Sequence, residues 1–173
     1  QGQRRLHFAS AMTLLGRSDG DDHSAGASYL ELAEFIIRNG ARTDADLEQL
    51  WRRIVFFISV SNTDDHLRNH GFLQVPGGGW TLAPAYDMNP SPGAEGLLLN
   101  ITEADNALSF DLAREVADLF RVKQRRASEI IAEVVDAVRP WRRLADRIGI
   151  SGQESERMAS AFHLTDGGSG QRP

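Results

Sequence analysis

The sequence predicts a mainly α-helical domain that carries one small β-hairpin. Two segments in the first sixty residues space their apolar side chains as amphipathic helices do, and the last third of the chain reads as further helices. Between these parts, two short extended runs flank a Gly-rich turn, which is typical of a hairpin. The chain has 173 residues, of which 41% are apolar and 25% charged, the composition of one globular domain.

The first forty residues predict two ordered segments separated by a loop. Residues 4–16 form a short helix or ordered segment that ends at Gly16, and the polar residues 17–26 form a loop. A helix follows within residues 27–40 and stops at its Asn-Gly pair, a common C-terminal signal. The residues expected on its buried face are Tyr29, Leu30, Ala33, Ile36 and Ile37.

The strongest helical pattern comes next. Thr43 and Asp46 resemble the two ends of a capping box that would begin this helix. Apolar residues then recur at i, i+3, i+4, i+7, i+8 and i+11, so we expect this helix to be the central post of the core. The members of this stripe are Leu47, Leu50, Trp51, Ile54, Val55 and Ile58.

The part that follows the hairpin is predicted to be mostly helical. Residues 97–101, LLLNI, could form a strand or a buried turn. Residues 166–173 have nothing to bury, so we expect a disordered tail after a single domain at residues 1–165. A second capping box, Ser151 with Glu154, should begin the last helix. The approximate spans of the expected helices are 109–120, 126–138, 140–148 and 153–163.

Composition excludes several classes of protein. There are no cysteines, which rules out disulfides, thiolate zinc sites and cysteine nucleophiles. The net charge of -5 argues against a surface that coats nucleic acid or a membrane. The sequence has neither an apolar run of about 20 residues nor the apolar core of a signal peptide. We therefore expect a cytoplasmic protein without direct nucleic-acid or membrane contact, and Gln1 in place of Met suggests a fragment or a processed product.

The densest polar run, NTDDHLRN at residues 62–69, lies between the buried helix and the hairpin. Protein kinases use an Asp to accept the substrate hydroxyl proton, an Asn five positions later to hold magnesium, and a metal-binding Asp further on. Asp64 and Asn69 have that spacing, and Asp87 follows the predicted hairpin. Magnesium prefers oxygen ligands and keeps several waters, so one Asn, one Asp and the phosphates of ATP would suffice.

Two separated motifs, NTDDHLRNHGFL and LAPAYDMNP, are similar in wording, order and spacing to the HipA family C-terminal domain. RRLHFASAMTLLG and SYLELAEFI also resemble family segments, so the likeness covers roughly residues 4–140. It implies the helical C-terminal lobe of a serine/threonine kinase that uses ATP and magnesium. The site residues that the resemblance implies are Asp64 as general base, Asn69 and Asp87 as magnesium ligands, His66 as a support of the loop, and Arg68 facing the transferring phosphoryl group.

The resemblance also implies partners. HipA-like proteins are kinase toxins of bacterial toxin-antitoxin modules that phosphorylate proteins of the translation machinery, notably an aminoacyl-tRNA synthetase. The family's N-terminal lobe supplies a phosphate-covering loop and a lysine for the ATP phosphates, and this chain has neither in a suitable place. Lys123 is the only lysine, and residues 77–79, the only run of three consecutive glycines, lie in the hairpin turn. We therefore expect the isolated chain to bind ATP weakly and to need an N-terminal lobe in cis or in trans.

Two other functions remain open. One is a non-catalytic interaction module that binds an antitoxin or a substrate protein. The other is a small-molecule phosphotransferase, because aminoglycoside and choline type kinases share the D-x-x-x-x-N logic. The YDMNP wording around Asp87 favours the protein kinase.

Two metal alternatives also exist. His66 and His70 would share a face as zinc ligands if the loop were helical, but the metalloprotease motif needs Glu after the first His. We expect His66 to bond the loop backbone or a carboxylate and His70 to be a polar flank. The acidic residues 19–23 could bind calcium but lack the terminal Glu of an EF-hand, so a mobile surface loop is expected. The remaining conspicuous residues should be solvated helix faces, Arg125-Arg126 and Arg142-Arg143, and packing groups, Trp51, Trp80 and Trp141.

Overall fold

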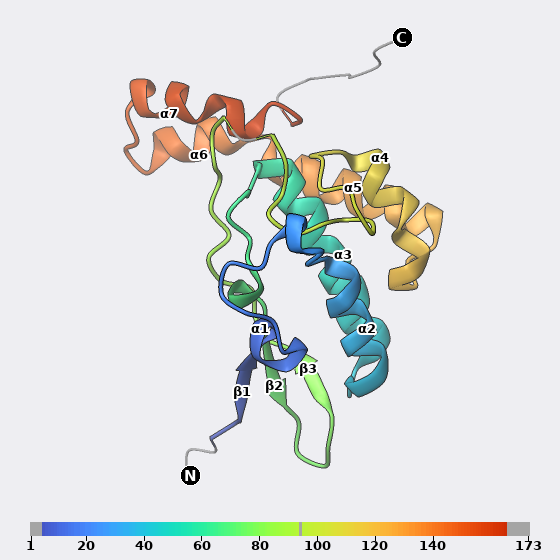
Figure 1. The fold of residues 1–173 in the computed structure, drawn as a ribbon. Helices are drawn as coiled ribbons and strands as arrows, with labels where there is room; N and C mark the ends of the chain where they lie inside the picture. Colours follow the sequence, from blue (N-terminus) through green and yellow to red (C-terminus); the bar gives the residue numbers. More distant parts are fainter. Residues whose placement is uncertain (1–4, 94, 166–173) are drawn as a thin grey trace.

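The computed structural model describes residues 5–93 and 95–165, and it confirms a mainly α-helical fold with a small antiparallel sheet. Figure 1 shows the sheet near the N-terminus, the α6–α7 pair at the opposite end, and α3 between them. The elements in chain order are β1 (Phe8–Ser10), α1 (Ala11–Leu15), η1 (His23–Ala25), α2 (Tyr29–Asn39), α3 (Thr43–Val60), η2 (Leu67–Asn69), β2 (Gly71–Gln74), β3 (Trp80–Leu82), α4 (Phe110–Glu115), η3 (Ala117–Phe120), α5 (Gln124–Val138), α6 (Trp141–Arg147), α7 (Gly152–Met158) and η4 (Ala159–Phe162), where η marks a 3₁₀ helix.

Helix α3 is the central post of the core, as predicted. All six residues of its apolar stripe are fully buried, and the helix packs against α2, α4 and α5. Trp51 adds a polar anchor, because its indole Nε1 donates a hydrogen bond to the carbonyl oxygen of Ala113 at 3.0 Å. A buried indole N–H needs such an acceptor. The helix thus fixes the position of the loop that leaves its C-terminus.

The capping box predicted at the start of α3 is wrong. The helix begins at Thr43 itself, and the cap residue Arg42 makes no side-chain cap bond. The Asp46 carboxylate accepts bonds from Thr81 Oγ1 at 2.8 Å and from the backbone N–H of Leu82 at 3.1 Å. The Asp46 carboxylate therefore bonds to β3 instead of capping its own helix, and in this way joins α3 to β3.

The hairpin forms as predicted, and a third strand joins it. Strands β2 and β3 pair antiparallel, and β1 pairs with the other edge of β2. Only an ordered segment or helix was expected over residues 4–16. The strand escapes a pattern search because it has three residues and runs directly into α1, whose cap Ser10 accepts a bond from the N–H of Thr13. The expected end at Gly16 is confirmed, with φ of 66° in the left-handed region.

Helix α2 lies where the sequence places it but is rotated slightly from its expected orientation. Ile37 is 45% exposed, whereas Leu32 is fully buried. The buried face is therefore centred on Tyr29, Ala33 and Ile36 together with Leu32, the i, i+3, i+4 and i+7 positions of an amphipathic helix.

The C-terminal part is helical as expected, with breaks. Residues 97–101 form a buried turn whose Asn100 makes an isolated bridge with Ser28. The helix expected over 109–120 is split into α4 and η3. The capping box at the start of α7 is confirmed, with Ser151 N–H donating to Glu154 at 3.0 Å.

The chain's C-terminal helices are held by an aromatic stack. Trp141 at the start of α6 lies against Phe162 with ring centroids 4.1 Å apart and planes 13° from parallel. The predicted tail at 166–173 lies outside the described residues. None of the helices within the described ranges has the length and apolar content needed to cross a bilayer.

Candidate active site

The polar loop at residues 61–70 leaves α3 through a left-handed residue, Ser61, with φ of 48°. It is then folded by its own hydrogen bonds. The carbonyl oxygen of Asp64 accepts the N–H of His66 at 3.0 Å and the side-chain Nδ2 of Asn69 at 3.2 Å. These bonds turn the Asn69 amide toward Asp64 and leave its oxygen Oδ1 without a donor among the described residues. The Asp64 side chain is exposed and makes no bond with any described residue.

The segment that carries Asp87 lies alongside this loop, as Figure 1 shows. Tyr86 donates its hydroxyl to the carbonyl oxygen of Arg68 at 2.6 Å, and the N–H of Ser91 donates to the carbonyl oxygen of Ser61 at 3.2 Å. These two bonds fasten the segment near both ends of the loop. The structure therefore brings the predicted residues 64, 69 and 87 onto two adjacent stretches of chain.

Asp87 itself has an unusual backbone. Its φ of 56° is left-handed, a conformation that costs a non-glycine residue of order 1 kcal/mol and that gathers at functional sites. The carboxylate Oδ1 of Asp87 accepts a bond from Asn89 Nδ2 at 2.7 Å. Asn89 therefore orients the carboxylate while its second oxygen stays available. The sequence interpretation missed this role of Asn89, although the residue stands in the YDMNP motif.

Arg68 is engaged with the acidic loop that precedes α2. Its guanidinium forms an ion pair with Asp19. A role of Arg68 toward a phosphoryl group stays a prediction, and it requires this pair to open. The neighbouring Asp22 caps η1 through bonds to Ser24, which lower the pKa of the Asp22 carboxyl. These acids are thus bonded to an Arg and to their own loop, which does not favour the calcium alternative.

His70 is not a polar flank, because it is fully buried and bonded to a carboxylate. Its Nε2 lies 2.7 Å from Asp65 Oδ2, which also accepts the Tyr29 hydroxyl at 2.8 Å. Burial, and then the Asp65 charge, raise the pKa of Tyr29 well above its usual value. Sequence reasoning expected the carboxylate bond at His66 instead. Asp65 links α2 to His70 at the end of the loop, and so fixes the chain on either side of Asn69.

A buried arginine lies beneath this network. Arg53 on α3 is 4% exposed, and one guanidinium nitrogen donates to the carbonyl oxygen of Ala83. Burial lowers the pKa of Arg53, and the charges of Asp65 and Asp46 oppose that shift. Burial raises the pKa of Tyr86; the charge of Arg53 opposes this shift, and those of Asp65 and Asp87 add to it. Arg53 falls three residues after Leu50 on the buried stripe, and this position was the signal that the sequence interpretation missed.

Buried polar atoms without a partner are concentrated here. Across the described part of the chain, the buried side-chain nitrogens that lack a hydrogen-bond partner belong to Arg53, Asn62, His66 and His70. Three of these residues are in the polar loop. The fourth, Arg53, interacts electrostatically with Asp65 of that loop. Folded proteins satisfy most buried polar groups, and exceptions need an explanation such as a functional site.

The donor set fits magnesium better than zinc. The amide oxygen of Asn69 and the carboxylate of Asp87 are hard oxygen ligands, which suit Mg²⁺ when phosphate oxygens and waters complete the shell. No three His, Cys, Asp or Glu side chains gather as metal ligands within residues 5–93 and 95–165. His70 points inward to Asp65, so a zinc site shared with His66 has no support.

Known proteins resemble this chain in sequence and in fold. The model of the HipA-like C-terminal domain matches residues 1–142. A Haemophilus influenzae protein described as "Putative kinase" is 34% identical over 68 residues, which are 39% of this chain and 20% of that protein. A chain in the complex of HipA, HipB and operator DNA, from the toxin-antitoxin system of Shewanella oneidensis MR-1, superposes with a TM-score of 0.67.

That likeness covers 93% of this chain and 43% of the Shewanella chain at 18% identity, so it bears on the fold alone. The chain therefore matches less than half the length of either relative. The family model, by contrast, takes in the polar loop, the hairpin and the segment with Asp87 together. On that match, the chain belongs to the HipA-like C-terminal domain family.

Proposed function

We propose that this chain is the catalytic lobe of an ATP-dependent serine/threonine protein kinase of the HipA type. The observation that carries the proposal is the pair of hydrogen bonds, Tyr86 to Arg68 and Ser91 to Ser61, that lay the Asp87 segment along the loop of Asp64 and Asn69. Family membership and the kinase-like spacing of these residues support the same function.

In this proposal, catalysis consists of positioning and charge neutralisation. Asp64 is exposed and free of internal bonds, so it can orient a substrate hydroxyl and accept its proton. Asn69, held by its bond to the Asp64 carbonyl, and Asp87, held by Asn89, would hold magnesium. A bound magnesium ion would neutralise charge on the transferring phosphoryl group. His66 would support the loop, and Arg68 would face the transferring phosphoryl group.

Binding of ATP would require a phosphate-covering loop and a lysine, and this chain has neither in a suitable place. The only lysine, Lys123, is the cap residue of α5, and the Gly77–79 turn joins β2 to β3. We propose that an N-terminal lobe, in cis or in trans, covers the ATP phosphates. The protein substrate would be a component of the translation machinery such as an aminoacyl-tRNA synthetase. An antitoxin protein would be a partner. With such a substrate and partner, the protein would act in the cytoplasm.

Phosphate transfer from radiolabelled ATP tests the assignment of the base, in a polypeptide that carries both lobes. Asp64→Asn should lower transfer by about 100-fold or more while leaving ATP affinity near its original value. The matched control is Asp118→Asn, which removes one exposed carboxylate on η3 and should leave the rate unchanged. Transfer retained by Asp64→Asn would refute the base.

The two magnesium ligands have a separate readout. Asn69→Ala and Asp87→Ala should each raise the magnesium concentration that half-saturates ATP binding, measured by calorimetry at fixed nucleotide. Asp64→Asn should not shift this concentration. An unchanged magnesium requirement in both ligand variants would contradict the proposed site.

A non-catalytic interaction module is the second candidate. The specific observation in its favour is that Arg68, which would face the phosphoryl group, is held by Asp19. If this function is correct, the two-lobe polypeptide transfers no phosphate, and Arg68→Ala or Asp19→Ala changes protein binding alone. Transfer that increases in Asp19→Ala would instead support the kinase with a pair that opens.

A further inference from the structure

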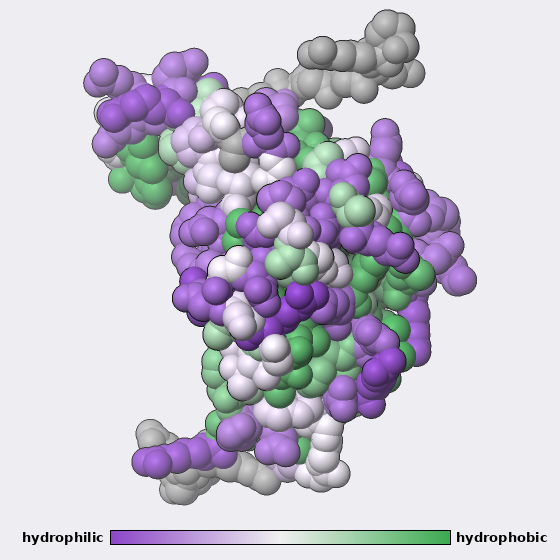
Figure 2. All heavy atoms as spheres, viewed as in Figure 1, coloured by the Kyte–Doolittle hydropathy of each residue, from purple (hydrophilic) through white to green (hydrophobic). Residues whose placement is uncertain are grey.

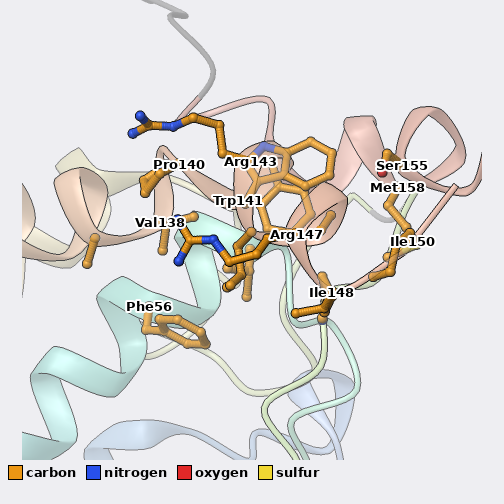
Figure 3. A pocket seen from close by; sticks show the side chains of 16 residues that line it. Phe56, Val138, Pro140, Trp141, Arg143, Arg147, Ile148, Ile150, Ser155 and Met158 are labelled. Atoms are coloured by element: carbon orange, nitrogen blue, oxygen red, sulfur yellow. The ribbon is translucent and has the colours of Figure 1, made fainter. Parts of the chain in front are cut away.

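A cavity of about 810 Å³ lies where the end of α3, the α5–α6 corner and the α7–η4 segment meet. Its wall is mostly apolar, and Figure 3 shows the side chains that line it. Volumes of several hundred Å³ with apolar walls are typical of ligand and partner sites. The apolar residues that define it best are Phe56, Val60, Val138, Leu144, Met158 and Phe162.

The apolar wall continues onto the surface of α6. Leu144 is 56% exposed and Ile148 is 66% exposed, although both line the cavity. They stand four residues apart and therefore form one edge of the helix. Figure 2 shows apolar surface at this end of the molecule, beside the α6–α7 pair. Large apolar side chains in such an arrangement mark an interaction surface more often than chance exposure.

Two arginines flank this edge with the same spacing. Arg143 and Arg147 also line the cavity and stand four residues apart on α6. Neither makes an ion pair or a hydrogen bond within the described part of the chain. By contrast, Arg139 pairs with Asp136 at 2.7 Å, so acidic partners do exist nearby. In Figure 3 both free guanidinium groups extend toward the side of the cavity with Val138 and Pro140.

We propose that this cavity and α6 dock an acidic amphipathic helix of a partner protein. Apolar side chains of the partner, repeated every three to four residues, would fill the cavity and cover Leu144 and Ile148. Asp or Glu beside that stripe would pair with Arg143 and Arg147. An amphipathic helix satisfies its own backbone hydrogen bonds and can therefore lay its apolar face into an apolar groove between helices. The sequence of residues 166–173 contains no large apolar side chain that could fill the cavity, which favours a partner protein as the occupant.

The proposed docking cavity does not include the proposed catalytic residues, but it borders the two chain segments that carry them. Val60 is the last residue of α3 before the polar loop, and Pro90 lies three residues after Asp87. Both line the cavity. A docked helix would therefore contact the residue that precedes the polar loop and a residue that follows Asp87, while docking itself requires no phosphate transfer.

The test uses synthetic helical peptides of about 16 residues as probes, with binding followed by anisotropy of a peptide dye. The first peptide has Leu at every third or fourth position and Glu beside that stripe, and the second has Lys in place of each Glu. We expect micromolar affinity for the Glu peptide and at least about 10-fold weaker binding of the Lys peptide. Equal affinity for both, or no binding at about millimolar concentration, overturns the proposal.

Charge reversal sharpens the same test. The double variant Arg143→Glu/Arg147→Glu should reverse the preference, binding the Lys peptide better than the Glu peptide. Both arginines are exposed, so the fold should survive, which circular dichroism checks. The matched control is Arg125→Glu on α5, which should leave the preference as it was. An unchanged preference in the double variant, or tighter binding to vesicles of anionic phospholipid than to the Glu peptide, overturns the proposal.

Discussion

The polar loop at residues 61–70 and the α6–α7 pair reverse the usual relation between polarity and burial. The loop is rich in Asn, Asp and His, yet Asn62, Asp65 and His70 are almost completely buried. Helix α6 exposes Leu144, and the residue that caps its C-terminus, Ile148, is exposed as well. Polar groups are usually outside and large apolar groups inside, so each region departs from what folding alone would select. These are the two regions to which we assign proposed functions, whereas α3, with its buried stripe, stabilises the fold.

The same contrast occurs within two neighbouring residues. Asp64 is exposed with a free carboxylate, whereas Asp65 is 1% exposed and bonded to Tyr29 and His70. One carboxylate is available to a substrate and the other holds the loop in place. Substituting Asp64 and Asp65 one at a time can therefore distinguish the roles of the two carboxylates.

The largest expected effect is that of Asp65→Ala. The substitution leaves Tyr29 and His70 buried without their acceptor, and removing one partner of a buried polar group costs about 3 kcal/mol of unfolding free energy. Urea unfolding measures it. Asp64→Ala is the matched control and should change stability by less than about 0.5 kcal/mol. Equal losses in the two variants would show that the contrast between the adjacent carboxylates is wrong.

The next effect concerns the attachment of α6 and α7. Phe162→Ala removes the ring that stacks on Trp141 and should cost about 2 kcal/mol, because the ring lines an open cavity and has fewer packing contacts than a fully enclosed Phe. Hydrogen exchange should show the loss as faster opening of α6 and α7, with α3 unaffected. Leu144→Ala, on the exposed edge, should leave exchange unchanged. Faster exchange throughout α3 would mean that the pair is part of the main core.

A smaller effect is expected where α3 meets the sheet. Asp46→Ala removes the acceptor of Thr81 Oγ1 and of the Leu82 N–H, which should cost about 1 to 2 kcal/mol in urea unfolding. Asp44→Ala is the control, since Asp44 is an exposed acid on the same turn and forms an ion pair with the exposed side chain of Arg121. If the control is as destabilising as Asp46→Ala, the role of Asp46 between α3 and β3 is wrong.

The sequence was sufficient for elements whose pattern is local. The stripe of α3, the hairpin and the cap of α7 are each determined by neighbouring residues, and all three were predicted correctly. Strand β1 and the role of Asp46 were missed because each depends on a partner distant in sequence, β2 and β3 respectively. Local periodicity carries no information about such a partner.

In the candidate site, too, features set by local sequence could be predicted and features that depend on distant partners could not. Positions 64, 69 and 87 could be named because they stand in two short motifs. The network of Asp65 with Tyr29 and His70 could not, since Tyr29 lies 36 residues from Asp65 and reads as an ordinary core residue. Exposure decides which of two adjacent acids is free, and exposure follows from the tertiary fold rather than from composition.

The smallest effect is expected from charged side chains that are paired but partly exposed to solvent. Arg126 on α5 donates to Glu48 at 2.8 Å and to Glu133 at 2.9 Å. The hydrogen bond from Arg126 lowers the pKa of Glu48, and bonds from Arg52 and then Arg126 lower that of Glu133. A lowered folded-state pKa adds stability above the usual carboxyl pKa of 4.5, and that stability is lost as the pH falls through the lowered value.

Arg126→Gln should therefore lower the melting temperature slightly at neutral pH, and the difference from the parent chain should vanish below the lowered pKa values. About 1 M salt should shrink the difference at neutral pH, because solvent already screens these side chains. Melting curves recorded across the acid range, beside those of Arg125→Gln, measure it. A loss at neutral pH as large as that of Asp65→Ala would mean that polarity, independent of burial, stabilises this fold. Burial would then not explain why Asp65 and Asp64 differ.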